Sequence, residues 1–100
     1  MTAMTTQHLR ATARALSDPE RDRRRKFAET VSDNHLLTAV VAAGVGDGEW
    51  RSSSDCAARA FAIDDRTMRR WLADSDIVLP RAVREKLLRL VWAFGLDLER

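Results

Sequence analysis

Residues 54–71 read SDCAARAFAIDDRTMRRW, and they carry the clearest structural pattern in the sequence. Its pattern predicts two short helices that pack against each other across a tight turn. The small Ala58 suits the point where the helices would cross, and Ala62 followed by Ile63 suits the turn. Asp64 is a residue type that commonly caps a helix N-terminus. The stretch therefore predicts a helix-turn-helix.

Apolar side chains on the facing sides of the two helices support this prediction, because residues three or four positions apart share one side of a helix. They are Ala57, Phe61, Met68, Trp71 and Leu72. We expect the first helix over about 55–61 and the second over about 65–73. A loop over 74–79 follows the second helix.

The rest of the chain also shows helical patterns. Further helices are expected over about 5–16, 18–31, 35–43 and 80–94. Asp18 is expected to cap the second of these, and Gly95 to end the last. No stretch alternates polar and apolar residues for long enough to require a strand. We predict an all-α fold, a compact bundle of five to six helices that contains the helix-turn-helix. Residues 1–100 would form one domain, with 1–32 as a helical extension and 33–95 as the core.

Composition places the chain among globular proteins. Apolar residues make up 45% and charged residues 32% of the 100 positions, which argues against wholesale disorder. The single cysteine, Cys56, cannot form an internal disulfide, and the N-terminus lacks the apolar core of a signal peptide. The longest mostly apolar run, 36–45, is too short to span a bilayer. We expect a cytoplasmic protein that does not enter the membrane.

The outer side of the helix at 65–73 carries a local positive charge. Arg66, Arg69 and Arg70 fall there with Asp65, while Thr67 lies at the margin, although the formal net charge of the chain is only +2. Arginine binds phosphates and can donate two parallel hydrogen bonds to guanine. This face is therefore a candidate DNA-binding surface.

Residues 57–73, AARAFAIDDRTMRRWLA, resemble the helix-turn-helix of the Cro-type (Xre-like) phage and bacterial repressors. Residues 77–83, IVLPRAV, are also similar to the loop and proline that follow it in that family. The resemblance covers roughly residues 50–92 and departs from the family at Ala62, where a glycine is usual. It implies that Asp65, Arg66 and Arg70 read bases and that Ser54 and Thr67 bind phosphates. Asp65 could accept a hydrogen bond from cytosine, or could only strengthen its helix N-terminus.

The function that these patterns favour is a sequence-specific DNA-binding transcriptional regulator, a repressor from a phage or mobile element. It would read the major groove of double-stranded DNA with the helix at about 64–73. An apolar C-terminal tail suits the contact of a homodimer; its residues are Trp92, Phe94, Leu96 and Leu98. The alternative is a module that binds a protein partner through the N-terminal helices, as an antitoxin, an anti-CRISPR-like inhibitor or a polymerase-binding factor.

Other candidate sites are weaker. The basic run at 21–26, RDRRRK, could be a solvated helix face, a second phosphate-binding strip or an interaction surface. Cys56 fits a small buried thiol better than a redox switch. His8 and His35 lack metal-ligand partners at suitable spacing. No set of nucleophile, base and orienting group can be named, so we expect no catalytic site, no cofactor and no enzyme.

Overall fold

The computed structural model describes residues 16–43, 58 and 61–99 of the chain. These residues form helices and no strand, which confirms the all-α prediction for this part of the chain. The helices are α2 (Asp18–Thr30), α3 (Asp33–Ala43), α5 (Asp65–Ala73) and α6 (Arg81–Phe94). Four helices are thus described where five to six were predicted. The other two, expected over about 5–16 and 55–61, lie outside the described residues except for Leu16, Ala58 and Phe61.

Capping side chains explain where the first two of these helices begin. The cap of α2 is Ser17 and not the expected Asp18, because the Ser17 hydroxyl accepts the Glu20 backbone N–H at 3.4 Å. Helix α3 begins two residues before the expected His35, because the Ser32 hydroxyl accepts the backbone N–H of His35 at 3.2 Å. Each hydroxyl satisfies a donor that the first turn of a helix leaves unpaired.

The ends of α5 and α6 agree with the sequence. Helix α5 spans the predicted residues and is capped by Asp64. Helix α6 follows Pro80 and ends at Gly95, which adopts the left-handed conformation with φ 60°. Glycine has no Cβ to clash there, so it ends a helix at little cost.

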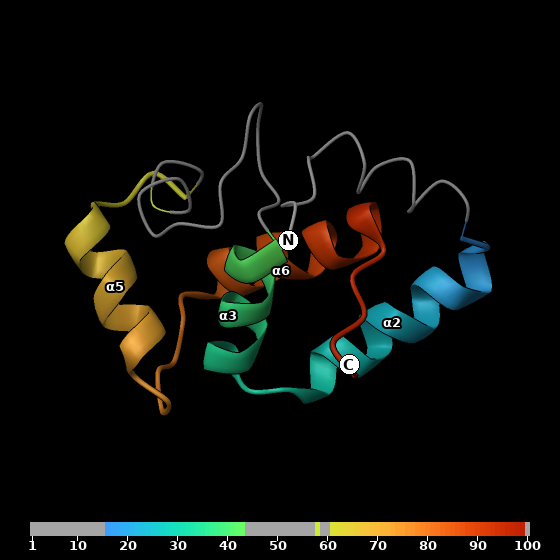
Figure 1. Cartoon of the computed structure of the whole chain (residues 1–100), viewed down its shortest axis with the longest axis horizontal. Helices are drawn as coiled ribbons and strands as arrows, with labels where there is room; N and C mark the ends of the chain where they lie inside the picture. The colour runs from blue at the N-terminus through green and yellow to red at the C-terminus, as the bar shows by residue number, and fades with distance from the viewer. Residues whose placement is uncertain (1–15, 44–57, 59–60, 100) are drawn as a thin grey trace, which may run out of the picture.

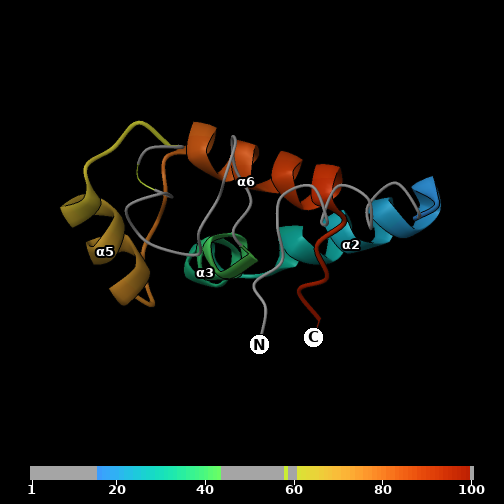
Figure 2. The same cartoon turned by 45° about the horizontal axis from the view of Figure 1, so that its top comes forward.

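Helices α2 and α3 both pack against α6, and α5 packs on α3 at one end of the molecule (Figures 1 and 2). The fully buried side chains come from all four helices. They are Ala28 of α2, Leu36, Leu37 and Val40 of α3, Met68 of α5, and Leu87 and Val91 of α6. Because α5 contributes only one of them, the arginine-bearing helix is held by a small part of the core.

The C-terminal tail packs into the core of its own chain. Phe94, Leu96 and Leu98 are 6%, 9% and 6% exposed, and the Leu96 backbone N–H donates to the Val91 carbonyl at 3.0 Å. The expectation that these side chains form a dimer contact is therefore wrong, because their apolar surface is already covered. A homodimer stays a prediction without this interface.

Candidate nucleic-acid interface

Asp64 fixes the start of α5. Its Oδ1 accepts the backbone N–H of Thr67 at 2.6 Å. This bond, a further one from the Thr67 side chain and the nearby positive charges of Arg70 and Arg66 hold the pKa of Asp64 below its usual value. The Thr67 hydroxyl, expected to bind phosphate, thus contacts the capping carboxylate of its own helix.

The turn before α5 has a left-handed residue at Ala62. Ala62 has φ 54°, and the backbone N–H of Ile63 donates to the carbonyl of Ala58 at 3.0 Å. A left-handed residue followed by a donor that reaches back five positions is the Schellman pattern that ends helices. The half-buried Phe61 contacts α6, because the Lys86 ammonium lies 4.9 Å from the centre of its ring. The turn is therefore tied to the body of the molecule.

Asn34 of α3 holds the other end of α5. Its side-chain Nδ2 lies 3.1, 3.0 and 3.0 Å from the carbonyl oxygens of Trp71, Leu72 and Asp74. These carbonyls belong to the last turn of α5 and the residue after it, where a helix lacks its own donors. Sequence reasoning missed this contact, because the partners are 37 to 40 positions apart and no local pattern links them.

The outer side of α5 is exposed as predicted, and its arginines differ in their partners. Arg66, Arg69 and Arg70 are all exposed. Arg69 Nε lies 2.8 Å from Asp65 Oδ2, so this arginine pairs with a carboxylate one turn earlier. Asp65 therefore supports its own helix through this ion pair, and its hydrogen bond to cytosine stays a prediction.

Arg66 and Arg70 differ in their ion pairing from most arginines that the structure describes. In the described part of the chain, most arginines pair with a carboxylate: Arg23, Arg24, Arg25, Arg69, Arg81 and Arg84. Over the same residues, no ion pair holds Arg66, Arg70 or Arg89. Arg66 and Arg70 are also four positions apart on one helix face, where like charges cost a few tenths of a kcal/mol. An anion from another molecule would relieve that repulsion.

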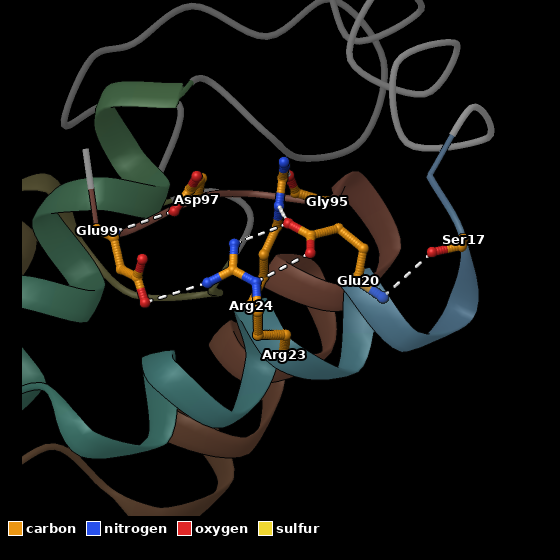
Figure 3. Close-up of polar contacts among 7 residues, drawn as sticks. All are labelled: Ser17, Glu20, Arg23, Arg24, Gly95, Asp97 and Glu99. Carbon is orange, nitrogen blue, oxygen red and sulfur yellow. Dashed lines mark hydrogen bonds and ion pairs between the residues drawn. The ribbon is translucent and has the colours of Figure 1, made fainter.

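The basic run at 21–26 has a different role from those considered in the sequence. Figure 3 shows Arg23 and Arg24 both directed at Glu20. Arg23 Nη2 and Arg24 Nε lie 2.7 and 2.9 Å from Glu20 Oε1. Arg23 also pairs with Glu99 at 3.1 Å, and Arg24 donates to the Gly95 carbonyl at 2.6 Å. The two arginines therefore join α2 to the C-terminal end of α6 and the tail beyond it.

Two further residues of the run contact Trp92 of α6. The indole Nε1 donates to Asp22 Oδ1 at 3.1 Å, and the Arg21 guanidinium lies 4.9 Å from the centre of the Trp92 ring. Residues 21–24 thus contact α6 and the tail within the chain, while Asp22 and Arg23 stay exposed to solvent. The Glu20 carboxylate between Arg23 and Arg24 has its pKa lowered to about 2, chiefly by the hydrogen bond from Arg23.

Several predicted residues lie outside the described residues, among them Ser54, Cys56 and His8. His35 is described and exposed, and no group of three metal-ligating side chains occurs within 16–43, 58 and 61–99. Over those same ranges no helix combines the length and the apolar character needed to cross a membrane. Comparisons with models of protein families, with curated proteins and with solved structures found no match to this chain.

Proposed function

We propose that the protein is a sequence-specific DNA-binding regulator and that α5 is the recognition helix of a helix-turn-helix over residues 54–71. The observation that carries the proposal is the exposed pair Arg66 and Arg70, which form no ion pair in the described part of the chain and have Asp64 as a nearby opposite charge. Guanidinium groups bind phosphates and guanine edges, so this pair suits DNA.

The local structure around α5 supports this role. The left-handed Ala62 and the Asp64 cap mark the turn at which α5 begins. Helix α5 lies at one end of the molecule (Figure 1). Met68 of this helix is buried, whereas Arg66, Arg69 and Arg70 are exposed. The major groove of DNA admits an α-helix whose exposed side chains contact the bases.

The proposed biological role is repression, with a dimer that would place two such helices about 34 Å apart on a palindrome. The alternative, a protein partner bound through the N-terminal helices, has less support. The arginines of α2 that could recognise an acidic partner are mostly used within the chain, as Arg23 and Arg24 show. DNA binding through α5 is therefore the preferred proposal.

A selection experiment tests the proposal. The full chain is used to enrich duplexes from a random pool, and fluorescence anisotropy then compares the enriched duplex with random duplex over a salt series. We expect the enriched duplex to bind more tightly and the affinity to fall with salt. The Arg66→Ala, Arg70→Ala double variant should lose about tenfold or more in affinity for the enriched duplex, because each bidentate arginine contact contributes about 1–3 kcal/mol.

The matched control is Arg25→Ala with Lys26→Ala, which removes the same charge from exposed positions of α2. It should lower binding to both duplexes only slightly. The proposal fails if the wild-type chain enriches no duplex even at low salt. It also fails if the α5 variant and the α2 control lose affinity equally, because total charge would then explain the binding.

A further inference from the structure

The first turn of α3 holds both ends of the linker between α5 and α6. Asn34 Nδ2 lies 3.0 Å from the Asp74 carbonyl, where the linker begins, and Asp33 Oδ2 accepts the backbone N–H of Leu79 at 2.7 Å, where it ends. Because Asp33 and Asn34 are neighbours, one helical turn sets the position of the whole linker relative to α3.

Asn34 reaches further, into the last turn of α5. Its amide lies within hydrogen-bond distance of the Trp71 and Leu72 carbonyls as well as that of Asp74. The apolar contact of α5 with the core depends on the buried Met68 and the half-buried Trp71 and Leu72. Apolar contacts are non-directional, so they leave the angle of a nine-residue helix weakly defined. The two hydrogens of the Asn34 amide, shared among three carbonyls at the end of α5, add the missing direction.

We infer that Asn34 is a positioning residue that sets the angle at which α5 and its outward Arg66 and Arg70 leave the body of the protein. The consequence for DNA depends on the proposed function. Base recognition requires side chains held within about 0.5 Å of the productive geometry, whereas phosphate contacts carry no sequence information. Loss of the Asn34 amide should therefore lower discrimination between DNA sequences more than it lowers affinity for DNA in general.

The first measurement needs no DNA. Residual dipolar couplings of backbone amides give the direction of α5 relative to α6 in the wild type, in Asn34→Ala and in Asn34→Asp. The aspartate has the shape of asparagine but lacks the amide donor, and its carboxylate repels the carbonyls of α5. We expect both variants to change the direction of α5 while α2, α3 and α6 keep their mutual arrangement.

The matched control is Ser32→Ala. It removes the hydroxyl that caps α3 at the His35 N–H, so it weakens the same end of the same helix. Ser32 makes no described contact with α5. The control should therefore leave the direction of α5 unchanged, which separates positioning from a general loss of stability.

The second measurement is the ratio of affinities for the enriched duplex and for random duplex. We expect the ratio to fall about tenfold in both Asn34 variants, comparable to the loss of one base contact, with less than about a twofold change for random duplex. The Ser32→Ala control should keep the wild-type ratio.

The outcomes separate the two proposals. If α5 keeps its direction in Asn34→Ala, the positioning role is refuted whatever the DNA result. If α5 turns but the ratio of affinities stays constant, the role in specificity is refuted. If the wild type shows no discrimination at all, the proposed DNA function fails, while the dipolar couplings still decide what Asn34 does.

Discussion

Ala62 shows how one residue can keep a turn at a cost in stability. Its φ of 54° lies in the left-handed region, where an L-residue with a Cβ is disfavoured by about 1–2 kcal/mol. The pattern of small and apolar residues predicted a turn here, and the structure shows that Ala62 is left-handed within it. The turn persists because Ile63 bonds back to Ala58 and packs against the core.

Ala62→Gly should stabilise the protein by about 0.5–1 kcal/mol. Glycine removes the steric cost of the left-handed backbone, and its greater entropy in the unfolded chain offsets part of the gain. Urea denaturation followed by circular dichroism measures the change. The control is Ala42→Gly at an exposed position inside α3, which should destabilise by roughly 0.5–1 kcal/mol. A loss of stability in Ala62→Gly would contradict the left-handed turn.

At the scale of the helices, the Glu20 carboxylate on α2 makes the stability of the protein depend on pH. Its pKa is lowered to about 2, because Arg23 and Arg24 donate hydrogen bonds to its carboxylate. In the unfolded chain the group titrates near 4.5. Its stabilising effect is therefore fully present above about pH 4.5 and is lost as the pH falls through about 2.

We expect Glu20→Gln to lower the melting temperature above pH 4.5, with the difference from wild type shrinking toward pH 2. Melting curves at several pH values between these limits measure it. The control is Glu29→Gln, which removes the same charge from the same helix. Glu29 pairs with Arg25 at 3.7 Å, and both side chains are about half exposed, so its effect should be smaller. A difference between wild type and Glu20→Gln that does not change with pH would rule out the ion pairs as its cause.

The helices also show which features could be predicted from the sequence and which could not. The bounds of α5 can be predicted from neighbouring residues. Asp64 directly precedes the helix as its cap, and Met68 and Trp71 lie three positions apart within it. The outward arginines follow from the same spacing. The docking of α2 does not, because Arg23 meets Glu99 across 76 positions and Arg24 meets the Gly95 carbonyl across 71. A run of charged residues in the sequence does not indicate which distant residues will contact it after the chain has folded.

For the molecule as a whole, Arg84 of α6 joins three helices at one point. Its guanidinium pairs with Asp33 in the first turn of α3 and donates to the carbonyls of Glu29 and Val31 at 3.1 and 3.2 Å, at the end of α2. Asp33 also accepts the Leu79 N–H at the end of the linker. One partly buried cation therefore satisfies the end of one helix and the start of another.

Replacing Arg84 tests whether this junction holds the molecule together. Arg84→Met keeps an apolar stem but removes every donor, which leaves the Asp33 carboxylate and two helix-end carbonyls without this partner. The pair is 24% and 17% exposed, between a surface pair and a buried one, so we expect a loss of about 2 kcal/mol of stability.

Arg81→Met is the control on the same helix, because its pair with Glu85 is 92% and 52% exposed and should contribute less than about 0.5 kcal/mol. Urea denaturation compares the two, and a double-mutant cycle with Asp33→Asn should give a coupling of about 1–2 kcal/mol. Equal losses in the two methionine variants would show that the junction contributes no more than a surface ion pair.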